Sequence, residues 1–531
     1  FWLYGRGAAG LVRFRPRRTG KEAGASRRRR THVVARPARG DGQKEERGKL
    51  RARRRRFSRD PGMFHATIDP EGPGVIRLHL RRSGGTVLAA IARRPRNLLW
   101  INGSQLLLLD ESAADVVQAL IEVVHELTRP GSEVSEETWS EVKRETARRV
   151  HELYPRVPTA EIEADIDYMY GLIAELSRGA CPAERGVPGR VMSRVEWRAP
   201  ARMDLMIASM GRSGCQNACA WCYASDMPNV RELDTESWKQ VLDRLWRAGI
   251  PMVNFTGGEP TMRRDLVELV RHAEKFVTGL ITNGRALADL VGKLKAASLD
   301  YVQVSIESAD PTVHDAIVGS AGAWEETCAG LKAALGAGMY VSTNTTLTKA
   351  NADGFPKLLR FLVGIGVRYV GCNTLIQTGR GARHPDAIEP QALKGVLAEA
   401  AAVARELDLE FSWFSPTCYK DLDPVAMGFG AKSCSACHTN MAVRPDGVVV
   451  PCQSWLHGEG LGNILTTPWE RIFNHPLARK VRAHGFAPPE CARCRHFVLC
   501  GGACPLEMLN ARGGHRERGK AGAESDVACG A

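Results

Sequence analysis

The alternation of apolar and polar residues changes along this chain, and its clearest part predicts parallel strands joined by helices. From residue 201 to about 410, short apolar runs alternate with segments whose apolar residues recur at helical spacing. The strand candidates are DLMIASM (204–210), MVNFTG (252–257), TGLITN (278–283), YVQVSI (301–306), YVSTNTT (340–346) and VRYVGCN (367–373). Crossover helices join parallel strands. Because six units are too few for a closed eight-stranded barrel, we predict an α/β fold built on a partial (β/α)6 barrel.

Residues 63–185 show a different pattern, which predicts a small α/β or winged-helix-like domain. Three strand-like runs, GVIRLHL, TVLAAIA and NLLWI, come first. A helix is expected over 110–127, with Ser112 as its N-cap, and a second helix is expected to begin near Thr159. Between them, TRPGSEVSEETW (128–139) predicts a polar connection. A generic helical cap on the barrel is the alternative to a winged helix.

The remaining segments have no regular apolar period. Residues 186–200 hold several Gly and Pro residues and are expected to be a linker. Residues 411–531 are rich in Cys, Gly and Pro. We therefore expect bound metal, more than a large apolar core, to organise this last domain.

Charge is concentrated at the start of the chain. Residues 1–62 contain 21 Lys and Arg against 5 Asp and Glu, whereas the rest of the chain contains 52 against 54. We expect a basic disordered arm or an over-extended start, and we do not expect nucleic acid as a partner. Neither a membrane-spanning apolar run nor a signal peptide is visible in the sequence, so the expected location is the cytoplasm without a membrane partner.

Cysteine usage indicates metal binding. The chain has 15 cysteines, and eleven of them are spaced as metal ligands often are. Thiols stay reduced in the cytoplasm, so such groups there indicate metal sites more than disulfides.

The first group of cysteines lies in GCQNACAWCYAS (214–225). Cys215, Cys219 and Cys222 form a C-x3-C-x2-C pattern directly after the first predicted barrel strand. A [4Fe–4S] cluster ordinarily takes four Cys ligands, so three would leave one iron open to another ligand. Barrel enzymes keep their active sites on such strand-to-helix loops. A structural zinc site with a remote fourth cysteine is the alternative.

Polar and glycine residues follow the next predicted strands. They are Gly257, Gly258 and Glu259 in NFTGGEP, Asn283 in ITNGR, and Ser305 and Glu307 in VSIES. Paired glycines let a ligand approach the backbone, and a carboxylate can bind an ammonium group. Each signal is weak alone, but their order at successive strand ends predicts one ligand site.

These motifs together resemble the radical S-adenosylmethionine (SAM) enzymes over residues 201–410. The resemblance implies that Cys215, Cys219 and Cys222 hold a [4Fe–4S] cluster that binds SAM. It implies that the SAM contacts come from Tyr223, Gly257, Gly258, Glu259, Asn283, Ser305 and Asn344. It also implies reductive cleavage of SAM to a 5′-deoxyadenosyl radical, which abstracts hydrogen from a substrate.

The C-terminal cysteines resemble those of the SPASM domain. Cys437 and Cys452 flank an Asp446–Gly447 turn, and CARCRHFVLCGGAC follows with C-x2-C-x5-C-x3-C spacing. The resemblance implies two auxiliary [4Fe–4S] clusters. It assigns Cys434, Cys437, Cys452 and Cys504 to the first, and Cys491, Cys494, Cys500 and Cys529 to the second. Two zinc ribbons are the alternative.

Four cysteines fall outside these patterns: Cys181, Cys328, Cys372 and Cys418. Buried thiols are common as plain core residues, and that is the expected role of these four. Cys418 stands apart from the other three because it lies just before the C-terminal cysteine group.

The resemblance also implies a substrate class. SPASM enzymes mostly act on peptides or proteins, and residues 63–185 look like winged-helix domains that bind leader peptides along a sheet edge. We therefore expect a ribosomally made peptide or a protein as substrate, and flavodoxin or ferredoxin as reductant. The alternatives are a maturase of a small cofactor, with a haem- or pterin-type precursor as its substrate, and a non-catalytic zinc-binding module.

Overall fold

The computed structural model describes residues 11–12, 63–68, 75–82, 85–92, 97–102, 105–127, 136–176, 197–210, 214–382, 384–456, 458 and 460–511. The expected arm at 1–62 lies outside these residues apart from Leu11 and Val12. Most of the expected 186–200 linker, together with Cys181 and Cys529, also lies outside them.

A largely parallel sheet forms the centre of the molecule. Its strand order is β13-β12-β11-β10-β9-β8-β7-β14-β15. The bounds are β7 (Arg202–Ala208), β8 (Met252–Gly257), β9 (Val277–Thr282), β10 (Tyr301–Ser305), β11 (Tyr340–Leu347), β12 (Tyr369–Thr374), β13 (Glu410–Trp413), β14 (Asn440–Val443) and β15 (Val449–Val450). Strands β7 to β13 pair in parallel and in chain order. All six predicted strands are present, which confirms the α/β fold with parallel strands.

Helices connect these strands. They are α5 (Thr235–Arg247), α6 (Leu266–His272), α7 (Leu287–Ala296), α8 (Pro311–Val318), α9 (Ala323–Gly336), α10 (Phe355–Gly364) and α11 (Pro390–Glu406), with short 3₁₀ turns η3 (Tyr223–Asp226), η4 (Pro260–Met262) and η5 (Gly379–Gly381). Helix α5 shows why they form. The Asp234 side chain caps it by accepting a hydrogen bond from the Ser237 amide at 2.8 Å, and Trp238, Val241 and Leu245 bury one face.

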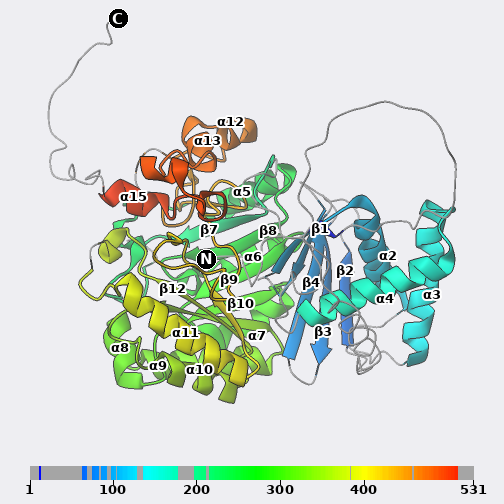
Figure 1. The fold of residues 1–531 in the computed structure, drawn as a ribbon, viewed down its shortest axis with the longest axis horizontal. Helices are drawn as coiled ribbons and strands as arrows, with labels where there is room; N and C mark the ends of the chain where they lie inside the picture. The colour runs from blue at the N-terminus through cyan, green and yellow to red at the C-terminus, as the bar shows by residue number, and fades with distance from the viewer. Residues whose placement is uncertain are drawn as a thin grey trace, which may run out of the picture.

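The leading domain is a second sheet with three helices. Its strand order is β1-β6-β5-β4-β3-β2. The bounds are β1 (Leu11–Val12), β2 (Met63–Ile68), β3 (Val75–Arg82), β4 (Gly85–Ala92), β5 (Leu98–Ile101), β6 (Gln105–Leu109), α2 (Glu111–Leu127), α3 (Glu136–Leu153) and α4 (Thr159–Leu176). Figure 1 shows this domain, in blue and cyan, beside the green parallel sheet.

Both faces of this leading sheet are buried at the described side chains of β4, β5 and β6. On β5, Leu98 and Trp100 join the core of the parallel sheet, whereas Leu99 and Ile101 pack with α2, α3 and α4. Side chains alternate between the faces of a strand, so one short apolar run supplies two different cores. The leading sheet is therefore a middle layer between its helices and the barrel.

Two predictions for this domain are wrong, and its winged-helix description stays a prediction. The polar connection was predicted to run to residue 139, but helix α3 already begins at Glu136. The buried face of this helix includes Val142 and Val150. Ser112 is not the N-cap of α2. Asp110 caps that helix instead, accepting hydrogen bonds from the Ala113 amide at 2.9 Å and from the Ser112 hydroxyl at 3.0 Å.

The C-terminal domain is joined to the parallel sheet through β14. Strand β14 pairs in parallel with β7 and forms a hairpin with β15 around Gly447, which confirms the predicted Asp446–Gly447 turn. The remaining elements are α12 (Trp469–Phe473), α13 (Pro476–Arg482), η6 (Pro489–Arg493), α14 (Phe497–Cys500) and α15 (Pro505–Ala511). In Figure 1 these helices, coloured orange to red, lie together near β7.

No helix in the described part of the chain has the length and apolar character needed to cross a bilayer.

Candidate active site

The three cysteines of the first group lie on one loop at the carboxyl end of β7. Cys215, Cys219 and Cys222 are free, half-buried thiols between the end of β7 and the start of η3. The Asn217 amide donates to Cys215 Sγ at 3.5 Å, and the Cys222 amide donates to the Cys219 carbonyl at 3.3 Å. These local hydrogen bonds fold the loop back on itself, so its thiols are near one another. We call residues 214–222 the cysteine loop.

Two neighbouring loops hold the cysteine loop from outside. The Ala218 amide donates to the carbonyl of Val318, at the end of α8, at 2.8 Å. On the other side the Arg380 amide donates to the Cys222 carbonyl at 3.1 Å. Gly379 has φ +59°, and a Cβ there would lie 2.5 Å from the Cys222 carbonyl oxygen. Close backbone contact of this kind requires glycine.

Burial dominates the electrostatics of these thiols. It raises the pKa of Cys215 to about 11, against hydrogen bonds from the Asn217 amide and the Asn283 side chain that lower it. Burial also raises the pKa of Cys219, and the neighbouring thiolates add to that rise. Without a bound metal the three thiols are protonated at neutral pH. A bound cation would reverse this, because a coordinating thiol is deprotonated.

The Gly-Gly-Glu turn after β8 lies directly against the cysteine loop. The Gly258 amide donates to the Ala208 carbonyl at 2.8 Å, and the Glu259 amide donates to the Gly214 carbonyl at 3.2 Å. Gly257 has φ +136°, and a Cβ there would lie 2.4 Å from the Ala208 carbonyl oxygen. The turn and the cysteine loop are therefore one backbone unit.

The Glu259 carboxylate is buried and joins two strand ends. Its Oε1 accepts hydrogen bonds from the Thr261 amide, the Thr261 hydroxyl and the Thr282 hydroxyl at 3.0, 2.6 and 2.7 Å. Its Oε2 accepts one from the Asn283 amide at 2.8 Å. Burial raises the pKa of Glu259, and these hydrogen bonds oppose that rise. Among the hydrogen bonds of the described residues, Oε2 has capacity for a further donor, whereas Oε1 has three already.

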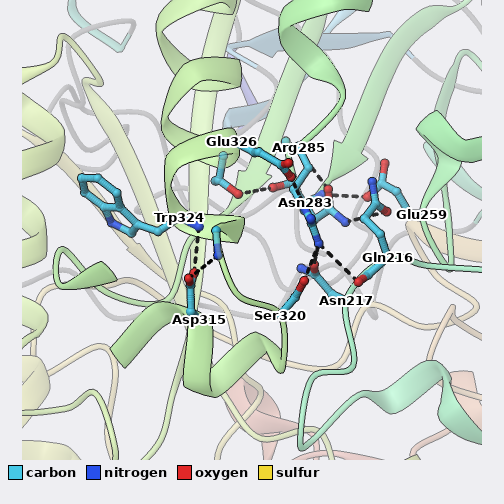
Figure 2. A network of polar contacts seen from close by, with 12 residues as sticks. Gln216, Asn217, Glu259, Asn283, Arg285, Asp315, Ser320, Trp324 and Glu326 are labelled. Carbon is cyan, nitrogen blue, oxygen red and sulfur yellow. Dashed lines mark hydrogen bonds and ion pairs between the residues drawn. The ribbon is translucent and has the colours of Figure 1, made fainter. Parts of the chain in front are cut away.

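Asn283 and Arg285 connect the end of β9 to the cysteine loop (Figure 2). Asn283 Nδ2 lies 3.8 Å from Cys215 Sγ and 3.2 Å from Gln216 Oε1. Arg285 Nη1 donates to the Gln216 carbonyl at 3.2 Å and to Asn217 Oδ1 at 2.8 Å. The same nitrogen contacts Ser320 Oγ at 2.7 Å, and Arg285 Nε pairs with Glu326.

Small apolar clusters cover the cysteine loop on two sides. Trp221 packs with Ile317, Val318, Ala323 and Leu375, and Cys219 lies against this cluster. Tyr223 and Cys222 lie against a second cluster, whose buried members are Met206, Ala224, Met227 and Leu456. Burial raises the pKa of the Tyr223 phenol, which therefore stays protonated. Such apolar surroundings limit the access of water to the thiols.

The ends of β10 and β11 bring further polar groups to the same edge of the sheet. Ser305 and Asn344 are paired residues in the register of these strands. Asn344 Nδ2 donates to Asn373 Oδ1 at 2.7 Å, but the buried Asn344 Oδ1 has no hydrogen-bond partner in the described structure. An unpartnered buried oxygen is costly, so a ligand that donates to it would be stabilised.

Glu307 is buried immediately beyond Ser305. It accepts a hydrogen bond from the Thr346 amide at 2.9 Å, and burial raises its pKa to about 8. Burial and the Cys222 thiolate raise the pKa of Cys219 most, and the negative charge of an ionised Glu307 raises it further. Glu307 therefore acts on the cysteine loop from the end of β10.

In the C-terminal domain the cysteines fall into two electrostatic groups. Burial raises the pKa of Cys434 to about 12, with a further contribution from Cys452. Burial also raises the pKa of Cys437 and of Cys504, and both respond to Cys434 and Cys452. These four thiols therefore affect one another electrostatically, and their assignment to one cluster stays a prediction.

Buried polar atoms surround this first C-terminal group. Ser435 Oγ, both ring nitrogens of His438, Asn440 Oδ1 and Gln453 Oε1 are buried without a hydrogen-bond partner in the described structure. The donors among them could bond to cluster sulfurs, which take hydrogen bonds from their protein surroundings. This donor set fits an iron–sulfur cluster. Within the described residues, no three Cys, His, Asp or Glu side chains converge as they would around one metal ion.

Two domains of known families cover these sites. Residues 212–362 match the radical SAM superfamily, and residues 434–495 match SPASM, an iron–sulfur cluster-binding domain. The chain therefore carries a radical SAM domain followed by a SPASM domain, and it is a radical SAM enzyme. These domains indicate [4Fe–4S] clusters and SAM as its cofactors.

Relatives and solved structures extend this picture. The PqqA peptide cyclase of Ruegeria pomeroyi is 29% identical over 269 residues, covering 49% of this chain and 70% of that protein. The AdoMet-dependent heme synthase of Methanosarcina barkeri is 27% identical over 325 residues, covering 57% and 92%. The crystal structure of Streptococcus suis SuiB bound to precursor peptide SuiA shares the fold, with a TM-score of 0.54, 16% identity, and coverage of 84% of this chain and 97% of that chain.

The structure also reveals site residues to which the sequence had assigned no role. Gln216, Asn217 and Arg285 form the network of Figure 2, and Arg380 lowers the pKa of Cys222 against the effect of burial. The only sequence signal was the position of Arg285 directly after the Asn-Gly turn at a strand end. Sequence spacing does not show which loop an arginine reaches.

Proposed function

We propose that this radical SAM enzyme abstracts hydrogen from a ribosomally made peptide. The observation that carries the proposal is the extent of the fold likeness. SuiB matches 84% of this chain, more than residues 201–531 alone can supply, so the match includes part of the leading domain. That solved chain is bound to a precursor peptide, and a sequence relative is named a peptide cyclase.

We assign the cluster that binds SAM to Cys215, Cys219 and Cys222. Their neighbourhood on one loop, the apolar cover and the close Gly-Gly-Glu turn support this assignment. When bound, SAM and the reduced cluster would supply the 5′-deoxyadenosyl radical. The apolar clusters around Trp221 and Met206 would keep water and competing hydrogen donors from the loop.

The residues around the loop would orient SAM. Oε2 of Glu259 has capacity for an ammonium donor, and Gly257 and Gly258 let the turn that carries Glu259 pack closely against β7 and the cysteine loop. The unpartnered Oδ1 of Asn344 would accept from a ligand hydroxyl, with Ser305 beside it. Tyr223 and Asn283 lie next to Cys222 and Cys215 and would contact SAM from the cysteine loop side.

For the C-terminal domain we assign Cys434, Cys437, Cys452 and Cys504 to the first auxiliary cluster. Their mutual electrostatic effects and the unpartnered buried donors around them support this set. Cys491, Cys494 and Cys500 belong to the second cluster.

The peptide would bind at an edge of the leading sheet. Both faces of that sheet are covered at the described side chains of β4, β5 and β6, and peptides commonly add to a sheet as an extra edge strand. Strand β6 already pairs with β1, whereas β2, at the other edge, pairs with β3 alone in the described structure. A peptide that adds to β2 would protect the β2 amides from hydrogen exchange, and unchanged exchange of Met63–Ile68 with bound peptide would contradict this site.

A small-cofactor precursor is the second candidate substrate, because the heme synthase likeness spans 92% of that relative. One experiment separates the two. The anaerobically reconstituted enzyme is incubated with SAM, a reductant and short peptides encoded near its gene, and products are read by mass spectrometry. We expect 5′-deoxyadenosine together with a peptide that has lost hydrogen. Cys219→Ala is the inactive control, and Cys328→Ala, which removes a buried thiol from α9, is the matched active control.

A result in which every peptide stays unmodified while a porphyrin or pterin precursor is converted would overturn the peptide assignment. It would leave the cluster assignment in place, because iron content and 5′-deoxyadenosine release test that assignment separately from the identity of the substrate.

A further inference from the structure

The turn that begins at Cys418 packs against the segment that carries Cys491, Cys494 and Cys500. After β13 the chain turns at Cys418, whose carbonyl accepts hydrogen bonds from the amides of Asp421 and Leu422, each at 3.0 Å. The next residue, Tyr419, places its ring 6.2 Å from the ring of His496, measured between centroids. His496 lies between Cys494 and Cys500 in the chain, so this contact brings Cys418 to the cysteine-rich turns.

Tyr419 fixes this position from a second direction. Its buried hydroxyl accepts a hydrogen bond from the Lys432 amide at 2.6 Å and lies 3.2 Å from the Lys432 carbonyl. Lys432 is two residues before Cys434, a proposed ligand of the first auxiliary cluster. The turn at Cys418 is therefore held between the two groups of thiols.

Three thiols of the second group lie on consecutive short turns. The Cys494 amide donates to the Cys491 carbonyl at 3.0 Å, and the Cys500 amide donates to the His496 carbonyl at 3.0 Å. The Gly502 amide then donates to Cys500 Sγ at 3.5 Å. One compact segment thus provides three of the four ligands that a [4Fe–4S] cluster ordinarily takes.

The electrostatics of the thiols agree with this placement from both sides. Burial raises the pKa of Cys418, and the Cys500 thiolate adds to the rise. Burial likewise raises the pKa of Cys491, with further contributions from Cys500, Cys418 and Cys494 in that order. Cys418 is thus one of a group of four neighbouring thiols.

We propose that Cys418, and not Cys529, is the fourth protein ligand of the second auxiliary cluster. The proposal rests on the cluster assignment made above and not on the identity of the substrate. Cys418 is already placed by hydrogen bonds and a ring contact, so little conformational entropy is lost when it binds iron. Helix α15 ends at Ala511, and the polar sequence 512–528 that separates it from Cys529 carries no comparable apolar pattern to hold Cys529 in place.

Iron counting in the full-length protein tests the proposal. Cys215, Cys219 and Cys222 are first replaced by Ala, so that only the auxiliary clusters remain, with about eight irons per chain expected. We expect Cys418→Ala in this background to lose between about one and four irons and to change the electron paramagnetic resonance spectrum of the reduced protein. Cys529→Ala and the control Cys328→Ala should keep all of the iron.

Loss of iron in Cys529→Ala, with or without a loss in Cys418→Ala, would overturn the assignment. Full iron in Cys418→Ala would overturn it as well.

If Cys418→Ala fails to fold, alkylation of the unmutated holoprotein tests the same assignment. Cys418 should resist iodoacetamide until the clusters are removed with a chelator, and Cys529 should react both before and after; the reverse pattern would contradict the proposal.

Discussion

Glu307 shows how strongly the barrel interior acts on a single side chain. Its carboxyl group is buried at the end of β10, close enough to the cysteine loop to affect Cys219. With a pKa near 8 it is largely protonated at neutral pH in the cluster-free protein. It can therefore donate a hydrogen bond where an ionised carboxylate could not.

This pKa predicts how stability changes with pH. A carboxyl group whose pKa is raised by folding holds its proton more tightly in the folded state. The unfolding free energy of the cluster-free protein should therefore fall as pH rises from about 4.5 to about 8, by at most on the order of 5 kcal/mol from this group. Glu307→Gln should reduce that slope in urea titrations. Equal slopes in wild type and Glu307→Gln would contradict this prediction.

Arg285 is a positioning residue whose effect can be measured separately from folding. It contacts Gln216, Asn217 and Ser320 with one nitrogen and so holds the cysteine loop from the β9 side. We expect Arg285→Ala to lower the rate of 5′-deoxyadenosine release about 10–100-fold, as is typical when a group that orients metal ligands is removed. Iron bound at the auxiliary sites should not change.

The matched control is Arg360→Ala, which removes an exposed ion pair with Glu406 on the outer helices. Surface pairs contribute little to stability. An equal decrease in both variants would mean that Arg285 has no special role at the loop. Partial rescue by Arg285→Lys would show that the positive charge matters, whereas no rescue would show that the forked geometry of the guanidinium is required.

Among the strands and turns, the Gly-Gly-Glu turn is the most constrained. Gly257→Ala would force a side chain to φ +136° and place its Cβ 2.4 Å from a backbone oxygen of β7. We expect an unfolding free energy lower by about 1–3 kcal/mol from backbone strain alone, together with weaker SAM binding. Thermal unfolding and calorimetry would measure the two effects.

Gly292 is the control for this substitution. It lies within α7 with no heavy atom near the position of an added Cβ. Gly292→Ala should be neutral or stabilising by up to about 1 kcal/mol, because alanine favours helix. If Gly257→Ala were as well tolerated as Gly292→Ala, the close contact between the turn and β7 would not exist in solution.

In the molecule as a whole, the leading domain is part of the core and not an appended module. Trp100 is fully buried against residues of the parallel sheet, while its neighbours Leu99 and Ile101 pack on α2, α3 and α4. Main-chain contacts also join the C-terminal domain to the barrel, including a 3.0 Å hydrogen bond from the Arg202 amide to the Thr439 carbonyl. The three domains therefore depend on one another for burial.

This arrangement predicts that the leading domain cannot be removed without damage. A chain that lacks residues 63–185 would expose the apolar surface now covered by Trp100 and Leu98, and we expect it to aggregate. Trp100→Ala in the intact chain should lower the unfolding free energy by about 3–5 kcal/mol without a separate transition for the leading domain. Light scattering and denaturant titrations would test both, and a soluble truncated protein with full cluster content would contradict the shared core.

The local pattern was enough to predict the barrel strands and the cysteine loop. Alternating apolar runs and helical periods are local properties, so six strands from β7 to β12 could be recognised without tertiary information. Cys215, Cys219 and Cys222 stand within eight residues, and such spacing is typical of cysteines that hold one metal cluster. Strand β13 was missed because four residues are too short for a clear period.

Most of the features that the sequence pattern did not predict depend on contacts between distant parts of the chain. Helix α3 is stabilised by a narrow buried face that packs in the core of the leading domain. Asp110, and not Ser112, caps α2 because its side chain accepts from the Ala113 amide, a geometry that composition does not reveal. The two cores of the leading sheet, the reach of Arg285 to Asn217 and the placement of Cys418 beside Cys491 join residues far apart in sequence. Such contacts are selected by the burial of whole surfaces, and only the folded chain brings those surfaces together.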